Sequence, residues 1–394
     1  MRSVHFGIVI NEFFHEQIGG FGGYGALAKN VCEYFNAKKN SPAHFQIFLP
    51  KFWCEVTKTY NTKIVRHPNY HSKFKYYYER LVYEFEKKWP DYFLTVEFDM
   101  NYHLHLDNNK KPIIIWIQDP RTINDWNRIG TVDLEKKFLN ITEGIEVLNK
   151  RISAFQDLVR LVEKQGRSIS FVTQAPGLVA KAKDIYSIDS VDDVTFVPNP
   201  IEMNEVEPEF EQKAEVPQIL YLGRMDPIKR PWIFFELARS LPQYNFVVAG
   251  VTHFSELIHP FIEKCKDLKN LEFRGLVIGQ EKDALLRESW ILVNTSIHEG
   301  LPVSWLEALF YKLPIVSTVN TENFASTYGE YVGEFLGDGA DAVPNLIDAI
   351  TGLVNDEKRR KNLAMSGYQH VIDTYSHRSF IQRLLHHVDS LNLS

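Results

Sequence analysis

Short apolar strands alternate with helical segments along the part of the chain that follows Pro217. Consecutive parallel strands can be joined only by a crossover of a dozen or so residues, which is usually a helix, whereas antiparallel strands can be joined by a tight turn. The alternation therefore predicts a doubly wound α/β domain with a parallel sheet. Its expected strands are Ile219 to Leu222, Phe246 to Ala249, Leu271 to Phe273, Ile291 to Val293 and Ile315 to Val316.

The first half of the chain has the same kind of pattern in a less regular form. A strand over Val4 to Ile10 is followed by a glycine-rich turn, a helix over Ala26 to Asn36 and a strand over Phe45 to Leu49. A second Rossmann-like α/β domain is expected here. Its later elements are a charged amphipathic helix over Lys73 to Lys88, a buried strand over Ile113 to Ile117, a helical stretch over Leu134 to Glu163, and strands near Ile169 to Val172 and Val194 to Val197.

Length and composition favour two domains. A chain of 394 residues exceeds what one hydrophobic core usually supports. Pro198, Asn199 and Pro200 precede an acidic segment with few large apolar residues, which predicts an N-terminal domain over 1–200 and a linker over 201–216. The second domain is expected over 217–370, with a C-terminal helix over 371–394 that can cross back to the first. Because open α/β sheets bind ligands at the carboxyl ends of their strands, the substrate site is expected in a cleft between the domains.

Several classes of protein are disfavoured by the composition. The three cysteines form no CxxC pair, so neither a disulfide framework nor a zinc site is predicted, and the N-terminus lacks a secretory pattern. No run approaches the roughly 18 apolar residues of a spanning helix. With a net charge of -6, no nucleic-acid partner is expected. We expect a cytoplasmic protein, with peripheral contact at the inner face of the membrane through the N-terminal domain as an open alternative to an ordinary amphipathic surface helix at 73–88.

The segment SIHEGLPVSWLEAL, Ser296 to Leu309, carries the most specific chemical signal. A strand leads into a loop that contains Glu299, and Pro302 stands where a helix would begin. The unpaired backbone N–H groups of a helix N-terminus are expected around Gly300, Leu301, Pro302 and Val303, where they favour an anion or sugar hydroxyls. Glu299 would face that space, and Glu307 would reach a neighbouring polar group such as a ribose.

This segment resembles the E-x7-E signature of retaining glycosyltransferases of the GT-B fold, family 4 (glycosyl transferases group 1). The resemblance implies that Glu299 contacts the donor sugar and that Glu307 contacts the ribose. YLGRMDPIKRP, Tyr221 to Pro231, is similar to the family's Gly-Arg-x-x-x-x-Lys segment. Gly223, Arg224 and Lys229 fill its positions, so Arg224 and Lys229 would neutralise the departing diphosphate. Gly275, Leu276 and Val277 resemble the family segment that holds the nucleobase.

A glycine-rich stretch in the first domain, Gly19 to Gly25, looks like the family's loop over the donor phosphate and acceptor, which implies contacts from Gly20 and Gly22. The stretch also contains a literal GxGxxG. A dinucleotide-binding oxidoreductase is nevertheless disfavoured, because about nine residues separate the strand from the motif and the second strand does not end in an acid.

Asp119 lies near a strand end where many relatives place a histidine. It is expected either to act in catalysis, by binding a hydroxyl or stabilising positive charge, or to cap the following turn. His298 and His15 are interpreted as local hydrogen-bonding residues, and Asn199 is assigned no chemistry because Pro200 replaces the family's glycine.

The resemblance implies a retaining transfer of a hexose from a nucleotide sugar to a carbohydrate or lipid-linked acceptor, as in polysaccharide biosynthesis. UDP-glucose is the expected donor. No cofactor or metal is expected, because the chain contains no Asp-x-Asp. The remaining alternatives are an inactive sugar-nucleotide-binding module, a phosphorylase that would need pyridoxal phosphate, and a glycoside hydrolase, whose two carboxylates would have to face each other across the bond.

Overall fold

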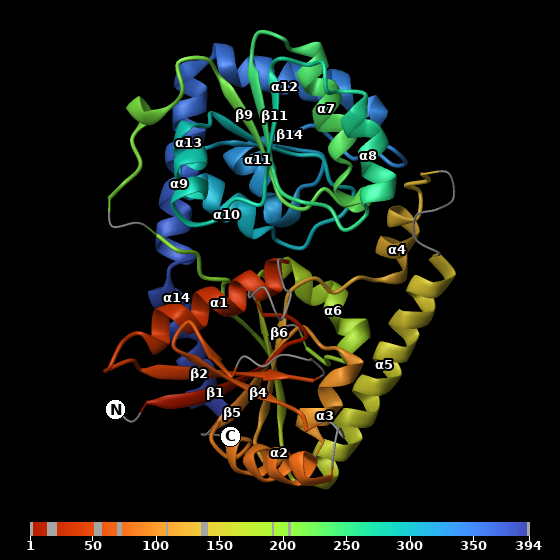
Figure 1. Cartoon of the computed structure of the whole chain (residues 1–394), viewed down its shortest axis with the longest axis vertical. Helices are drawn as coiled ribbons and strands as arrows, with labels where there is room; N and C mark the ends of the chain where they lie inside the picture. The colour runs from red at the N-terminus through yellow and green to blue at the C-terminus, as the bar shows by residue number, and fades with distance from the viewer. Residues whose placement is uncertain are drawn as a thin grey trace. The chain divides into compact units, whose positions relative to one another are not determined.

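The computed structural model describes residues 3–13, 22–50, 57–68, 73–107, 109–134, 141–190, 193–203 and 206–391 (Figure 1). The chain forms two compact units. The first unit comprises 1–120, 146–202 and 376–394, and the second comprises 121–145 and 203–375. The expected division at residue 200 was therefore wrong for 121–145, which pack with the second unit.

The first unit is built on one twisted sheet whose described strands lie in the order β3-β4-β2-β1-β5-β6-β7-β8. All neighbours are parallel except β3 and β4, which form an antiparallel hairpin. The strands are β1 (Val4–Val9), β2 (Ala43–Leu49), β3 (Lys58–Thr59), β4 (Thr62–Arg66), β5 (Tyr92–Val96), β6 (Ile113–Ile117), β7 (Ile169–Thr173) and β8 (Val194–Phe196). The principal helices are α1 (Gly23–Asn36), α2 (Lys73–Glu86), α3 (His103–Leu106), α5 (Ile141–Lys164), α6 (Val179–Tyr186) and α14 (His377–Leu391).

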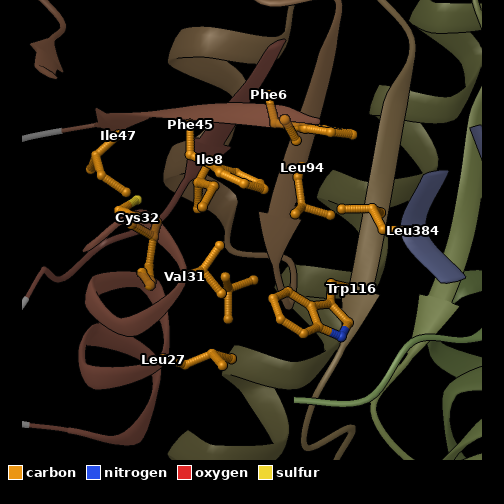
Figure 2. Close-up of a cluster of buried hydrophobic side chains, with 14 of the residues drawn as sticks. Phe6, Ile8, Leu27, Val31, Cys32, Phe45, Ile47, Leu94, Trp116 and Leu384 are labelled. Atoms are coloured by element: carbon orange, nitrogen blue, oxygen red, sulfur yellow. The ribbon is translucent and has the colours of Figure 1, made fainter. Parts of the chain in front are cut away.

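The core of the first unit lies between its sheet and α1 and α14. Figure 2 shows Val31 of α1 and Leu384 of α14 among side chains that project from the central strands. Each such fully buried aliphatic side chain contributes about 1.5 to 3 kcal/mol relative to exposure. Cys32 lies in the same cluster, where burial raises the pKa of its thiol to about 12. The C-terminal helix is therefore part of this core, although it follows the whole second unit in sequence.

The second unit is a parallel sheet with described strands in the order β11-β10-β9-β12-β13-β14. Its strands are β9 (Gln218–Leu222), β10 (Asn245–Ala249), β11 (Leu271–Gly275), β12 (Ile291–Asn294), β13 (Ile315–Ser317) and β14 (Gly329–Tyr331). Its helices are α4 (Ile123–Ile129), α7 (Pro231–Ser240), α8 (Ser255–Glu263), α9 (Gly279–Glu288), α10 (Val303–Phe310), α11 (Phe324–Tyr328), α12 (Val343–Asn355) and α13 (Glu357–Thr374). The strand order reverses between β9 and β12, which creates a topological switch point.

Each unit is thus a Rossmann-like parallel α/β unit, as the sequence predicts. In the second unit the buried faces of β9, β10 and β12 pack against α7 and α12. The segment that contains α4 joins the same core through Ile129 and Val132, both fully buried. Thr122 and Asp125 form a capping box that begins α4.

The expected linker is tied to the second unit over residues 206–216. The indole N–H of Trp290 donates to the Ala214 carbonyl at 2.8 Å, and Lys213 Nζ donates to the Tyr311 carbonyl at 2.9 Å. Burial lowers the pKa of Lys213 to about 7. This part of the linker is therefore held against the second unit by hydrogen bonds.

Within the described part of the chain, no helix combines the length and the apolar character needed to cross a bilayer.

Candidate active site

Two oppositely charged side chains predicted from separate motifs meet at the switch point of the second unit. Lys229 ends the short 3-10 turn after β9, and Glu299 lies on the loop after β12. Lys229 Nζ is 2.6 Å and 2.7 Å from the two carboxylate oxygens of Glu299. The parallel neighbours β9 and β12 bring both loops to one edge of the sheet, although 70 positions separate the residues.

Glu299 is held by further donors from its own loop. Ser296 Oγ donates to Oε1 at 2.5 Å, and Asn294 Nδ2 donates to the same oxygen at 3.1 Å. Burial by itself would raise the pKa of Glu299. The Lys229 charge and the three hydrogen-bond donors outweigh that effect and lower the pKa below its usual value. Glu299 is therefore a pre-oriented carboxylate in its ionised form.

The backbone around Lys229 is fixed from the interior by Arg230. Arg230 adopts a left-handed conformation with φ +45° and is fully buried. Its guanidinium donates to three carbonyls on two segments, those of Thr295 and Ser296 at 2.8 and 3.1 Å and that of Phe335 at 2.7 Å. Burial lowers the pKa of Arg230 to about 10. Arg230 thus joins the loops that carry Lys229 and Glu299.

Arg224 lies at the beginning of the loop after β9, directly after Gly223. The φ of Gly223 is +154°, a conformation that favours glycine. Arg224 Nη1 is 3.1 Å from Asp226 Oδ2 and 3.4 Å from His253 Nδ1. Its side chain is 42% exposed, whereas that of Asp226 is 9% exposed. Asp226 therefore holds a solvent-accessible cation beside the switch point.

Glu307 lies on α10 and pairs with Lys282 of α9 at 2.7 Å. Both side chains are only partly buried, with exposed fractions of 20% and 27%. Glu307 is therefore already neutralised by a neighbour that the sequence did not suggest.

The other residues of the second unit that are predicted to contact the donor lie at the end of β11 and at the start of α10. Gly275 ends β11 with φ +65°, Leu276 is 41% exposed and Val277 is buried. Gly300 and Leu301 are buried, and Pro302 is the N-cap of α10, with Val303 the first helical residue. Among the residues that the structure describes, no side chain makes a capping hydrogen bond at this helix N-terminus.

Three residues of the predicted site, Gly20, Gly22 and Asp119, belong to the first unit. Gly22 is the N-cap of α1, and a side chain there would approach Glu12, which accepts from the Gly25 N–H at 2.8 Å. Gly20 and His15 lie outside the described residues. Asp119 follows β6, and its backbone N–H donates to Glu97 Oε2 at 2.7 Å.

Glu97 itself was missed by the sequence analysis. It is buried with φ +58° and accepts from the backbone of Gln118 and Asp119 and from the Tyr186 hydroxyl. Burial raises the pKa of Glu97, and these hydrogen bonds oppose the rise. Glu97 therefore fixes the backbone at Gln118 and Asp119.

Buried amides surround Asn199 at the carboxyl ends of β6, β7 and β8. Asn199 exchanges hydrogen bonds with the Gln118 amide at 2.9 and 3.1 Å and donates to Gln174 Oε1 at 2.6 Å. Gln174 Nε2 in turn donates to the Gln118 carbonyl at 2.7 Å. The assignment of no chemistry to Asn199 fits this structural role.

His298, next to Glu299, contacts a residue from the other half of the sequence. Its Nδ1 is 3.4 Å from Asp125 Oδ1, and the side chains of the two residues are 4% and 3% exposed. His298 therefore contacts a residue that is distant from it in sequence.

Glu97, Lys282 and Asp125, which the sequence did not single out, have partners that are distant in sequence. Asp226 lies inside the Gly223 to Lys229 motif and could have been suspected from its position. Lys282 and Asp125 carried no signal of their own. Among the described residues, no group of three or more His, Cys, Asp and Glu side chains is arranged to hold a metal ion.

A family model matches the second unit. Residues 203–370 match the model described as glycosyl transferases group 1. The chain is 23% identical over 217 residues to poly(ribitol-phosphate) alpha-N-acetylglucosaminyltransferase of Staphylococcus aureus, covering 52% of this chain and 41% of that protein. It is 29% identical over 149 residues to UDP-Gal:alpha-D-GlcNAc-diphosphoundecaprenol alpha-1,3-galactosyltransferase of Escherichia coli, covering 33% and 38% respectively. The matches thus span about two fifths of the length of these curated relatives.

The fold has counterparts among solved structures. The crystal structure of Anabaena HepE in complex with UDP and glucose superposes with a TM-score of 0.64 at 10% identity, covering 98% of this chain and 99% of that one. The fold is that of GT-B glycosyltransferases.

Proposed function

We propose that this chain, which belongs to the GT-B glycosyltransferases of group 1, moves a hexose from a UDP-hexose to a carbohydrate or lipid-linked acceptor with retention of configuration. The observation that carries the proposal is the Lys229 and Glu299 pair at the switch point of the second unit. An ionised carboxylate and a cation at that edge suit a sugar diphosphate, whose two ends carry hydroxyls and negative charge. The relatives that act on UDP-galactose or bind UDP support a UDP donor.

In the proposed reaction, Glu299 orients the donor sugar through its hydroxyls. Arg224 and Lys229 oppose the charge that develops on the diphosphate as the glycosidic bond breaks, and the α10 N-terminus adds backbone donors. The acceptor hydroxyl would then attack the face of the sugar from which the diphosphate leaves, and its proton would pass to the departing phosphate oxygen. Lys229 would exchange part of its contact with Glu299 for the diphosphate when the donor enters.

Glu307 would hold the ribose, and Gly275 to Val277 would hold the base. Asp119 and the loop containing Gly20 and Gly22 would serve the acceptor side and the phosphate. Because two fixed cations neutralise the diphosphate, the reaction would not require a metal.

An initial test of the proposal is a thermal-shift screen of UDP, GDP, ADP and their sugars, followed by transfer assays with and without EDTA. A ligand at 100 times its Kd adds about 2.7 kcal/mol of stability. We expect UDP to give the largest shift and turnover of the donor to persist in EDTA. Loss of turnover in EDTA that Mn²⁺ restores would contradict metal independence, and binding without turnover would favour a sugar-nucleotide-binding module.

A lipid surface is the proposed environment of the acceptor, because α2 exposes an apolar stripe. Tyr77, Leu81 and Phe85 are 59%, 71% and 75% exposed, and Tyr78 and Val82 flank them. Residues 73–88 contain five Lys and Arg against three Glu. Aromatic side chains beside cations are typical of helices that lie in a membrane interface.

Vesicle flotation tests this contact directly. The chain should bind vesicles that contain phosphatidylglycerol, and the double variant Leu81→Ser, Phe85→Ser should bind at least tenfold more weakly. Leu336→Ser, which removes an exposed leucine of the second unit, is the matched control. Equal binding by all three proteins, or a dimer that the double variant abolishes, would contradict the membrane assignment.

A further inference from the structure

The loop that carries Glu299 is held from two sides. On one side, the Ile297 N–H donates to the Ile228 carbonyl at 2.9 Å, and Ile228 immediately precedes Lys229. On the other side lies α4, a helix that the first half of the sequence contributes to the second unit. The loop that carries Glu299 is therefore contacted by a segment that lies far outside its own motif.

The contact with α4 is made by a buried polar pair. Asp125 Oδ1 lies 3.4 Å from His298 Nδ1, and both side chains are almost completely enclosed. The other oxygen of Asp125 accepts from the Thr122 backbone N–H and hydroxyl at 3.0 and 2.9 Å. Asp125 is thus held rigidly by its capping box, so it presents one oxygen to the histidine in a fixed direction.

Docking of α4 is secured independently of this pair. Ile129 and Val132 are fully buried in the core of the second unit, and Arg128 contacts Glu334 at 2.7 Å and the Ile297 carbonyl at 3.4 Å. Thr131 Oγ1 accepts from the Gly337 N–H at 2.9 Å. Removal of the carboxylate of Asp125 should therefore leave the helix in place, and the role of the buried pair can be tested apart from the fold.

We propose that Asp125 and His298 are positioning residues that hold the Glu299 carboxylate in its productive orientation. The Asp125 carboxylate, 3.4 Å from Nδ1 of His298, fixes the orientation of the ring. The ring in turn fixes the backbone that precedes Glu299. A displacement of about 1 Å at a reacting group can lower the rate a hundredfold. A side chain that fixes the backbone next to Glu299 should therefore affect the rate of the reaction.

Asp125 is also close in sequence to Asp119 of the predicted site. Only Pro120, Arg121 and Thr122 separate Asp119, which follows β6 of the first unit, from α4. A change in the backbone after β6 therefore has a short path to the residue that orients His298.

Hydrogen exchange followed by mass spectrometry tests the positioning role without any assumption about activity. Asp125→Asn and His298→Gln should each raise the exchange rate of the peptide 296–301 at least tenfold, while the peptide over β12 is unchanged. Thr131→Ala, which removes a different contact of the same segment, should not change exchange at 296–301. Unchanged exchange in Asp125→Asn, or an equal rise in Thr131→Ala, would overturn the proposal.

The kinetic measurement rests on the proposed function and uses UDP-glucose turnover and UDP affinity. Asp125→Asn should lower kcat about tenfold and leave the UDP Kd within twofold, because only the orientation of Glu299 is lost. The double variant Asp125→Asn, His298→Gln should be no slower than the slower single variant, since both act through one contact. Additive losses, or a loss of UDP affinity as large as the loss of kcat, would overturn the positioning role. If the parent protein neither binds UDP nor turns over UDP-glucose, the proposed function fails, and the exchange measurement still decides the role of the pair.

Discussion

The carboxyl ends of the two sheets carry different kinds of polar group. At the switch point of the second unit, charged pairs lie at partly accessible positions, as in Lys229 with Glu299 and Arg224 with Asp226. At the strand ends of the first unit, neutral amides around Asn199 bond to one another in the interior. A charged pair can exchange partners when an anionic ligand arrives, whereas a buried amide network has little tolerance for rearrangement. The comparison indicates that the charged groups of the second unit can change partners when a ligand binds. The amide network of the first unit should instead keep its hydrogen bonds, and we call it a fixed frame.

The largest effect is expected from Glu299→Gln, which keeps the shape of the side chain and removes its charge. The interaction with a sugar that gains positive charge should be strongest in the transition state, so kcat should fall by roughly a hundredfold or more. UDP affinity should stay nearly intact, because Lys229 remains. Steady-state kinetics and calorimetry with UDP measure the two quantities.

The control for that measurement is Glu357→Gln, since Glu357 is an exposed carboxylate on α13 paired with Lys361. It should behave as the parent protein does. Full kcat in Glu299→Gln would remove the basis for assigning donor chemistry to the second unit.

A smaller effect is expected from Glu307→Ala, because Glu307 would hold the ribose equally in the ground and transition states. UDP binding should weaken by about 1 to 3 kcal/mol, the cost of losing a charged hydrogen bond. Lys282→Ala is the matched variant, because it removes the ion-pair partner and leaves Glu307 in place. It should keep UDP affinity within about threefold. Parent-like UDP affinity in Glu307→Ala would show that the Glu307 carboxylate pairs with Lys282 and does not contribute to UDP binding.

The charged site could be predicted from the sequence because its signals are local. Gly223 to Lys229 and Ser296 to Leu309 each follow a short buried strand, and parallel pairing brings such loops to one edge. The doubly wound fold could be predicted for the same reason, since alternation of strand and helix is a local pattern.

Contacts set by packing could not be predicted in this way. The capping box of Thr122 and Asp125 marks the start of a helix, but nothing in those residues shows which sheet the helix covers. Residues 121–145 were therefore placed in the wrong unit, and the contact between Asp125 and His298 was not foreseen. The neutral amides of Gln118, Gln174 and Asn199 likewise carry no pattern of charge or spacing that distinguishes them from surface amides.

The fixed-frame interpretation of the first unit is tested by Asn199→Ala. The variant leaves amide groups of Gln118 and Gln174 buried without their partner, so the free energy of unfolding should fall by about 1 to 3 kcal/mol. Urea denaturation measures the change. Asn101→Ala, at an exposed position of the same unit, should unfold as the parent does. A stability equal to that of the parent in Asn199→Ala would show that the network can rearrange, and the contrast between the two sheets would disappear.

The smallest effect is a pH dependence of the first unit, where hydrogen bonds from histidines that are neutral in the folded state hold α14. His387 bonds to Thr195 Oγ1 at 2.8 Å and to Ser170 Oγ at 2.9 Å, and His377 bonds to Asn30 Oδ1 at 2.9 Å. Burial lowers the pKa of each ring to about 4, helped by His386 near one and Lys38 near the other.

Because these folded-state pKa values lie below the unfolded value of about 6.5, the unfolded chain takes up protons first as the pH falls. The stabilising contribution is complete above pH 6.5 and is lost as the pH decreases toward 4. Between pH 7 and pH 5.5, each histidine should cost about 1 kcal/mol of stability. His387→Gln should therefore lose less stability than the parent over this interval, and His259→Gln, at an exposed position on α8, should lose as much as the parent. Urea denaturation at the two pH values gives the comparison. An equal loss in the parent and in His387→Gln would mean that the histidine is protonated without leaving its partners, and that α14 is fastened by its apolar face alone.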